Sequence, residues 1–347
     1  MSISLIDIII PNRNKASFLA RTIASLRSQT EADWRAIVID GDSNDGSLAI
    51  LQAAALEDSR FVILTARPAS LTGLSLYRSW NQGLLHVRAP YFAVLTSDDM
   101  WDPTWLRSAL DALEANSQAI AAVSRAISID AVDSVCGPTV SCKQLENSFA
   151  LEGSGRRLLD SRSCAIRALL FGPIFSTIHS MVLRSSILEE GVIFAEDLGF
   201  AADIEYYLHA CLRGDIVYDM EHRALFRTYE GQESSMGKGP AISHLWRKVI
   251  QRNRKLVARQ LGIPLEELIQ VTDEILERHL FVMTKPNRAL FEKSKILAFF
   301  RMLRACCRSP RLGLEYIRVR ASRERFLLEP AAALANQLSV KYGFRGA

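Results

Sequence analysis

The stretch Tyr91–Asp99 reads YFAVLTSDD and joins a short apolar run to two adjacent acids. The run is typical of a buried strand, and Asp98 and Asp99 would stand at its carboxyl end. Ligands of open α/β folds bind at that edge of the sheet, where carboxylate oxygens suit Mg²⁺ or Mn²⁺ carrying a polyphosphate. The same two acids could instead form a turn before a helix that starts near Thr104.

The residues on either side of this stretch alternate between strand and helix patterns. Near-continuous apolar strands separated by helices indicate a mostly parallel sheet that is covered on both faces. The fold class predicted is therefore α/β. The expected strands are Ile6–Pro11, Ala36–Asp40, Phe61–Leu64 and Tyr91–Thr96, and the expected helices are Ala16–Gln29, Ser47–Leu56, a helix around Leu76–His86, and Thr104–Asn116.

Polar residues follow three of these strands at the point where each strand ends. Because the carboxyl ends of parallel strands meet at one edge of a sheet, these side chains are expected to lie near one another. They are Asn12, Arg13 and Asn14 after the first strand, Asp40 and Asp42 at the second, and Asp98 and Asp99 at the fourth.

Length and composition indicate a globular protein. The chain has 347 residues, of which 49% are hydrophobic and 23% charged, enough for one large core and a smaller additional part. No apolar run approaches the roughly 20 residues of a membrane span, and the N-terminus leads directly into a strand, so a cytoplasmic location is expected. The six cysteines show no CxxC pair, which favours reduced thiols over disulfides or zinc.

The charge is divided unevenly along the chain. Residues 1–244 hold 21 Lys and Arg against 29 Asp and Glu, whereas residues 245–347 hold 21 against 9. The stretch Gly237-Lys238-Gly239-Pro240, whose glycines and proline interrupt regular secondary structure, separates these parts. It predicts a boundary near residue 240. An acidic α/β region, 1–240, would therefore precede a basic helical region, 241–347.

Several short motifs, in their order and spacing, resemble the family 2 glycosyltransferases, which are inverting enzymes of the GT-A fold. The resemblance covers residues 4–130 well and 194–227 more loosely. It implies a Rossmann-like GT-A sheet with a nucleotide-sugar-binding half, 1–130, and an acceptor-binding half, 131–240. The motifs are Pro11-Asn12-Arg13-Asn14, Ile23–Thr30 (IASLRSQT), Ile39–Ser47 (IDGDSNDGS), Asn81-Gln82-Gly83 and Ser97-Asp98-Asp99.

The resemblance implies that Pro11, Asn12 and Asp40 hold the donor nucleoside. A carboxylate can accept the imide N–H of uracil or thymine, which favours a UDP- or dTDP-sugar. Arg13 stands where the family commonly has an aromatic residue and could stack on a base. Asp40 could alternatively be a turn residue that caps the next helix. The remaining expected donor contacts are Asn14, Asp42, Arg78 and Asn81.

The acid motif departs from the family pattern at its first position. Similar enzymes often read Asp-x-Asp-Asp, and here Thr96 replaces the first acid. This leaves Asp98 as the direct ligand of Mn²⁺ or Mg²⁺, and Asp99 as a second ligand or as the residue that orients the donor sugar. The ion would neutralise charge on the departing nucleoside diphosphate.

The segment Phe194–Tyr207 (FAEDLGFAADIEYY) resembles the part of the family in which an acid at the start of a helix removes the acceptor proton. In this register the catalytic base is Asp203, and Ala202 stands where a Glu is usual. Glu196, Asp197 and Glu205 are alternatives. An acid at a helix start can also serve only the helix dipole.

Two residues are expected to contact the acceptor. Trp101 follows the acid motif and could stack on a sugar ring, although a core or lid role fits equally. His179 lies where similar enzymes line the acceptor pocket, or is a structural histidine beside an apolar strand. Arg227 and Tyr229 resemble the family's Arg-x-His pattern near the diphosphate, with Tyr in place of His.

The basic region predicts a contact with a membrane surface. Within Lys293–Arg308 (KSKILAFFRMLRACCR), apolar residues form a stripe beside several cations. Such a helix could lie on the inner face of the plasma membrane and serve a glycan or lipid-linked acceptor. The alternative is a helix that packs its stripe on the catalytic region. No recognition motif for nucleic acid accompanies the charge.

Taken together, these features predict a metal-dependent transferase that builds surface polysaccharide or glycan. Nucleotidyltransferases and dinucleotide-dependent enzymes need a glycine-rich loop after the first strand, which Asn12–Ala16 does not provide. The rival interpretation is a catalytically inactive GT-A-fold scaffold that only binds sugar nucleotides, because Gly41, Thr96 and Ala202 depart from the family pattern.

Overall fold

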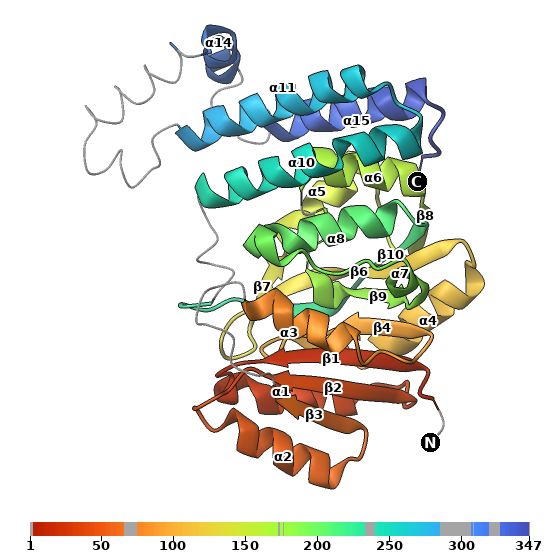
Figure 1. Cartoon of the computed structure of the whole chain (residues 1–347), viewed down its shortest axis with the longest axis vertical. Helices are drawn as coiled ribbons and strands as arrows, with labels where there is room; N and C mark the ends of the chain where they lie inside the picture. Colours follow the sequence, from red (N-terminus) through yellow and green to blue (C-terminus); the bar gives the residue numbers. More distant parts are fainter. Residues whose placement is uncertain are drawn as a thin grey trace.

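The computed structural model describes residues 3–65, 75–172, 174–175, 177–232, 240–284, 307, 309–318 and 327–346. A ten-stranded sheet forms the centre of the molecule, and its strands follow the order β3-β2-β1-β4-β9-β6-β10-β5, with β7 beside β6 and β8 beside β10. Figure 1 shows the N-terminal strands at one end of the molecule and a layer of C-terminal helices at the other.

The first part of the sheet is parallel, as the alternation of strands and helices predicts. It consists of β3 (Phe61–Thr65), β2 (Trp34–Asp40), β1 (Ile6–Asn12) and β4 (Tyr91–Val94). All seven residues of β1 are buried because helices cover both faces. Asn12 pairs in register with Asp40, so the polar ends of β1 and β2 are level.

Three helices connect these strands, at the positions expected from the sequence. They are α1 (Ala16–Arg27), α2 (Ser47–Glu57) and α3 (Ser75–Leu84). Helix α3 packs very closely on β1 at Gly83, where an added Cβ would lie 2.4 Å from Cγ2 of Ile9. Only glycine allows this approach, which explains the glycine of the Asn81-Gln82-Gly83 motif in physical terms.

The second part of the sheet is mixed. Strand β9 (Met181–Arg184) is antiparallel to both β4 and β6 (Ala119–Ile129), and β6 is parallel to β10 (Asp215–Arg227). The short strand β5 (Met100–Trp101) pairs with β10. This pairing brings residues 96–99, called the acid loop below, beside the end of β10. The expectation of a mostly parallel sheet therefore holds for the N-terminal strands, while β7 (Val135–Pro138) and β8 (Arg156–Leu159) add further antiparallel pairs.

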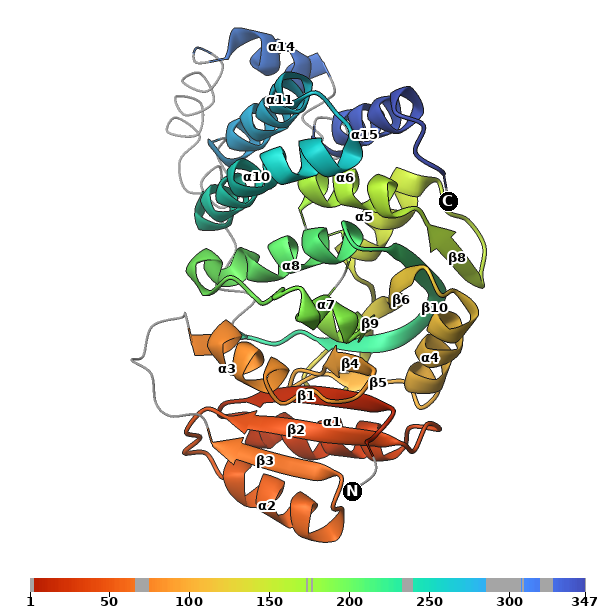
Figure 2. The same ribbon diagram turned by 45° about the vertical axis from the view of Figure 1, so that its right-hand side comes forward.

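Helices cover this second part as well. The segment predicted to hold the catalytic base forms the 3₁₀ helix η2 (Glu196–Ala201), which is followed by α8 (Ala202–Cys211). In Figures 1 and 2 the start of α8 lies on the same side of the molecule as the carboxyl ends of β1–β3. The other elements here are α4 (Trp105–Ala115), α5 (Val140–Phe149), α6 (Ser161–Phe171), η1 (Ile178–Ser180) and α7 (Ser186–Glu189).

The C-terminal region is helical, as its sequence predicts. Its elements α10 (Pro240–Leu261), α11 (Leu265–Thr284) and α15 (Glu329–Lys341) lie beside α6 in Figure 2, and α14 (Pro310–Arg318) follows further out. Apolar residues of α10, α11 and α15 join those of α6 and α8 in a single buried cluster. The change of charge near residue 240 is thus not a division of the hydrophobic core.

Two further expectations concern this region. Nearly all of the amphipathic stretch Lys293–Arg308 lies outside the described residues. Among the helices that are described, none combines the length and the apolar character that crossing a bilayer would require.

Candidate active site

The ends of β1 and β2 form a buried polar pair. The Asn12 amide Nδ2 donates to Asp40 Oδ1 at 2.7 Å, and Ser43 donates its hydroxyl to the same oxygen at 2.7 Å and its backbone N–H to Oδ2 at 3.0 Å. Asp40 therefore fixes the turn that follows β2. It does not cap the next helix, because the N-cap of α2 is Gly46. The Oδ1 atom of Asn12 is buried and has no partner within the described part of the chain. An N–H donor from a ligand could complete it.

The other predicted donor residues on this edge have different surroundings. Asn14 and Asp42 both adopt a left-handed backbone, with φ of 52° and 62°. Asn14 Oδ1 accepts the backbone N–H of Asn44 at 2.9 Å, so this side chain braces the two loops. Arg13 and Asp42 are exposed, whereas Pro11 is buried within β1. Arg13, Asn14 and Asp42 are thus the exposed residues among the predicted contacts on this edge.

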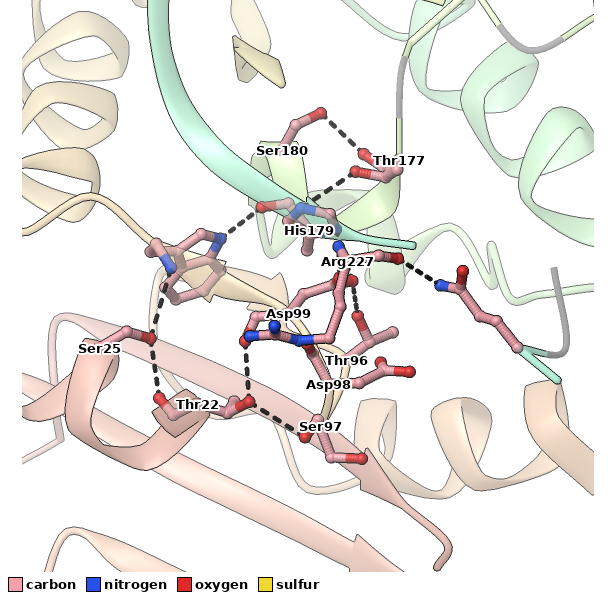
Figure 3. A network of polar contacts seen from close by, with 12 residues as sticks. Thr22, Ser25, Thr96, Ser97, Asp98, Asp99, Thr177, His179, Ser180 and Arg227 are labelled. Atoms are coloured by element: carbon pink, nitrogen blue, oxygen red, sulfur yellow. Dashed lines mark hydrogen bonds and ion pairs between the residues drawn. The ribbon is translucent and has the colours of Figure 1, made fainter. Parts of the chain in front are cut away.

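Asp99 is held by the protein on both of its carboxylate oxygens (Figure 3). Its Oδ1 accepts the backbone N–H of Arg227 at 2.7 Å. Its Oδ2 accepts a short hydrogen bond from Thr96 and lies 3.1 Å from Nδ1 of His179. The side chain is buried. These contacts leave Asp99 poorly placed to coordinate a metal, so the prediction of a second carboxylate ligand lacks support from the geometry.

Arg227 ties the acid loop to the end of β10. Its guanidinium is fully buried, donating from Nε to the backbone oxygen of Asp98 at 2.7 Å and from Nη1 to that of Asp130 at 2.7 Å. From α1, the Thr22 hydroxyl reaches the backbone oxygens of Ser97 and Asp99 at 3.0 and 2.8 Å. The loop is therefore rigidly positioned before any ligand binds.

Asp98 has a different environment from its neighbour. Figure 3 shows its carboxylate pointing away from the Asp99 network. Its Oδ2 accepts hydrogen bonds from Lys15 Nζ at 3.0 Å and from the Tyr229 hydroxyl at 2.8 Å, while Oδ1 has no hydrogen bond to the described residues. Partial burial favours a neutral amine, but Asp98 and Tyr229 raise the pKa of Lys15 above its ordinary value, so the side chain is an ammonium at neutral pH.

The residues around Asp98 set what kind of ion could bind. No group of three or more His, Cys, Asp or Glu side chains is arranged for a metal in the described ranges. One free carboxylate oxygen suits a Mg²⁺ or Mn²⁺ ion whose other ligands are phosphate oxygens and water. It does not suit an ion held by the protein alone.

The acceptor contacts predicted from the sequence are not exposed. Trp101 is 2% exposed and donates its indole N–H to the backbone oxygen of His179 at 2.6 Å. His179 is 1% exposed, faces Asp99 and stacks on Phe226. Both side chains support the acid loop from within the core, so the expectation of direct acceptor contact is wrong for this structure. Trp101 is instead a core residue, and His179 is a structural histidine.

Arg78 and Asn81 also differ from expectation. Asn81 Nδ2 donates to the Phe194 backbone oxygen at 2.9 Å, and its Oδ1 accepts the Phe194 N–H at 2.9 Å. Arg78 pairs with Glu196 at 3.1 Å. Both residues of α3 therefore hold the segment before α8 rather than presenting free groups to a donor. The sequence placed them correctly on one helical face but could not show which element that face contacts.

Asp203 is the acid at the start of α8, as predicted. Its carboxylate is half-buried and accepts the backbone N–H of Ile204 at 2.8 Å. Burial raises the pKa of Asp203 to about 7. No cation of the described residues pairs with the carboxylate to lower the pKa again. A carboxylate with this pKa is suited to accept a proton near neutral pH.

The three alternative acids in this segment are engaged. Glu196 pairs with Arg78, Asp197 with Arg252, and Glu205 accepts the Asn253 amide at 2.7 Å. Among these four acids, Asp203 is thus the one that no partner of the described residues neutralises.

Sequence reasoning missed Lys15 altogether, although a cation directly after the polar end of the first strand was a signal that could have found it.

Comparison with known proteins adds a family to this geometry. Residues 7–144 match the family described as glycosyl transferase family 2. The N-terminal part of the chain is therefore similar to that family. An uncharacterized glycosyltransferase of Haemophilus influenzae is 25% identical over 287 residues, covering 82% of this chain and 83% of that protein. The resemblance noted from the sequence motifs is therefore confirmed.

A shorter relative is named for its reaction. The Escherichia coli UDP-Glc:alpha-D-GlcNAc-diphosphoundecaprenol beta-1,3-glucosyltransferase WfgD is 33% identical over 97 residues, or 28% of this chain and 36% of that one. The family 2 relatives support a glycosyltransferase role in polysaccharide biosynthesis.

Solved structures share the fold. S. aureus TarS 1–349 in complex with UDP superimposes with a TM-score of 0.55 and 16% identity, covering 97% of this chain and 91% of that one. The Pyrobaculum calidifontis mannosyltransferase PcManGT, in complex with GDP-Man and Mn²⁺, gives 0.53 and 14%, with 99% and 88% covered. The predicted GT-A fold is thereby confirmed.

Proposed function

We propose that this protein is an inverting, metal-dependent glycosyltransferase that moves a sugar from a nucleotide sugar to an acceptor hydroxyl. The observation that carries the proposal is a contrast between two acids. Among the described residues, one oxygen of Asp98 at the carboxyl edge of the sheet has no partner, and Asp203 at the start of α8 has no cation beside it. Asp98 is suited to hold a metal ion at the donor's diphosphate, and Asp203 is suited to accept the acceptor's proton.

Asn12 and Asp40 would recognise the nucleoside. The unpartnered Oδ1 of Asn12 can accept the imide N–H of uracil or thymine, which supports a UDP- or dTDP-sugar. Arg13 would lie against the base and Asp42 near the ribose, since both are exposed beside this pair. The UDP complex of TarS favours the same choice, while the GDP-Man complex of PcManGT makes guanosine the alternative to test.

Asp98 would hold Mn²⁺ or Mg²⁺ through its free oxygen. When bound, such an ion neutralises charge on the departing nucleoside diphosphate. Asp99 would act through position: by binding the Arg227 backbone it fixes the direction of Asp98. The Mn²⁺ in the PcManGT complex supports this assignment.

Asp203 would take the acceptor proton. The acceptor oxygen forms a bond to the anomeric carbon from the face opposite the phosphate, and its proton passes to the Asp203 carboxylate. The bond from the anomeric carbon to the phosphate oxygen breaks, and the nucleoside diphosphate leaves with the electron pair. The raised pKa of Asp203 favours this role.

The acceptor would be a growing surface glycan or a lipid-linked one. The name of WfgD includes a diphosphoundecaprenol acceptor, which supports the second possibility. The excess of cations in residues 245–347 would then draw a cytoplasmic protein to the inner face of the plasma membrane. Residues 1–240 would form the catalytic unit, with 1–130 for the donor and 131–240 for the acceptor, and 241–347 would support it.

A screen of nucleotide sugars by thermal unfolding tests the proposal. In the presence of Mn²⁺, a ligand at 100 times its Kd adds about 2.7 kcal/mol to the free energy of unfolding. Asp98→Asn should lose the Mn²⁺-dependent part of the response, and Asp111→Asn, a matched change on the surface of α4, should keep it. A full response in Asp98→Asn would contradict the metal assignment.

The screen also addresses the scaffold alternative. A sugar-nucleotide-binding protein without activity would be stabilised by the donor yet release no nucleoside diphosphate over long incubation. Steady release in the wild type would exclude that alternative.

A further inference from the structure

Lys15 stands at the centre of a cluster that the proposed mechanism does not use. Its ammonium lies 3.0 Å from Asp98 Oδ2 and also bonds to the Tyr229 hydroxyl. Lys15 comes directly before α1, whereas Tyr229 follows β10, so the cluster joins two distant parts of the chain. The carboxylate expected to face the diphosphate thus already carries one positive charge from the protein.

The position of the ammonium is fixed by packing. The backbone N–H of Lys15 donates to the Ser47 hydroxyl at 3.0 Å. Its side chain runs along the Tyr229 ring, with Nζ 5.2 Å from the ring centre, and that ring packs on Phe18 at 4.7 Å between centres. A long flexible side chain is therefore held in one place, which reduces the entropy lost when it binds a ligand.

The ammonium can also make one more contact. It has three N–H donors, and two of them are used by Asp98 and Tyr229. The third has no acceptor among the described residues, and the side chain is 21% exposed. A phosphate oxygen is a suitable acceptor because hydrogen bonds between ions are stronger than those between neutral groups.

The two oxygens of Asp98 then have separate roles. Oδ2 holds the Lys15 ammonium, whereas Oδ1 has no partner among the residues described and can bind a divalent ion. Thr96 replaces the additional acid of similar enzymes, so this loop has less negative charge to repel a diphosphate. The arrangement provides a cation from the protein itself beside the free oxygen of Asp98.

We propose that Lys15 is a diphosphate-binding residue of the donor site, acting beside the divalent ion and independently of it. This inference rests on the proposed function. It adds that the site retains affinity for the diphosphate of a nucleotide when divalent ions are removed.

Calorimetric titration of UDP, dTDP and GDP against the free nucleosides tests this inference. In EDTA, the wild type should bind its preferred nucleoside diphosphate about tenfold more tightly than the nucleoside, the value of one charged hydrogen bond. Lys15→Met should abolish this difference while binding the nucleoside as the wild type does, which also shows that the variant is folded. Lys255→Met, which removes an exposed lysine from α10, should retain the difference.

The possible outcomes separate the two proposals. If Lys15→Met kept the tenfold difference in EDTA, or if the wild type bound nucleoside and diphosphate equally there and gained affinity with Mn²⁺ alone, the role of Lys15 would be refuted and the proposed function would stand. If no nucleoside diphosphate bound the wild type in either buffer, both would fall. Should Lys15→Met fail to fold, Lys15→Gln, which removes the charge but keeps a polar end group, is measured in its place.

Discussion

The donor side and the base side of the proposed site hold their charges in opposite ways. On the donor side, Asp40, Asp98 and Asp99 each accept hydrogen bonds from side chains or backbone of other elements. On the base side, Asp203 receives a backbone N–H and no cation from the part of the chain that the structure describes, and burial raises its pKa to about 7. The contrast indicates that the donor side holds its acids in fixed positions and that the base side is suited to exchange a proton.

The largest expected effect comes from the base side. Asp203→Asn keeps the size of the side chain but cannot accept a proton, so the rate of nucleoside diphosphate release should fall by about 10²–10⁴. Donor affinity should stay the same, because the donor side is untouched. Steady-state kinetics together with calorimetry would measure both.

Glu205→Gln is the matched control for this change, since Glu205 is two residues away on α8 and already bonds Asn253. A loss of activity in Glu205→Gln as large as in Asp203→Asn would mean that the base has been wrongly assigned.

The next effect compares the two adjacent acids. Asp99→Ala removes a buried carboxylate and leaves the N–H of Arg227, the Thr96 hydroxyl and His179 without it, so the free energy of unfolding should fall by about 3 kcal/mol. Asp98→Ala should lower it by less than half as much. Urea unfolding of both variants measures the difference, and equal losses would show that Asp99 has no special structural role.

A smaller effect is expected at the link between the two sides. Asn81→Ala breaks two hydrogen bonds to Phe194 and should lower kcat through displacement of η2 and α8, by the equivalent of about 1–2 kcal/mol. Arg78→Ala on the same helix loses an exposed ion pair and should change kcat little. If the KM for the donor rose in Asn81→Ala while kcat stayed constant, the residue would contact the donor after all.

The smallest effect expected is the pH dependence. Asp203 must be ionised to act, so kcat should rise with pH around a midpoint near 7 and fall about tenfold between pH 7.5 and 6.

Stability should change in the opposite direction. The unfolded chain loses this proton near 3.8 and the folded chain near 7, so the folded state should lose stability as the pH rises between these values. This loss of stability with rising pH should be weaker in Asp203→Asn.

For the activity, a pH profile of kcat that is flat from 5.5 to 8 would contradict the raised pKa of Asp203.

The sequence predicted the position of the residues at the strand ends better than that of the other site residues, for a physical reason. Strands β1–β4 alternate with helices whose period is visible locally, and parallel order brings their ends together, so Asn12, Asp40 and Asp98 could be placed in advance. The burial of Trp101 and His179 depends on β5 pairing with β10, which lies more than 100 residues later. Contacts of that range leave no periodic signal in a single sequence.

The same limit explains Asn81 and Lys15. Both were visible in the sequence, but their partners, Phe194 and Tyr229, come from elements that only the mixed part of the sheet brings near. Asp203 was found because the family motif includes it, while its lack of a cation became clear from the contacts of its neighbours.

A crystal structure with Mn²⁺ and a nucleotide sugar tests the central claim most directly. The account predicts the base of the nucleotide at Asn12 and Asp40, the metal on Asp98 Oδ1, and Asp203 facing the anomeric carbon on the side opposite the phosphate. A nucleotide bound elsewhere, or an Asp203 carboxylate that cannot approach that carbon, would contradict it.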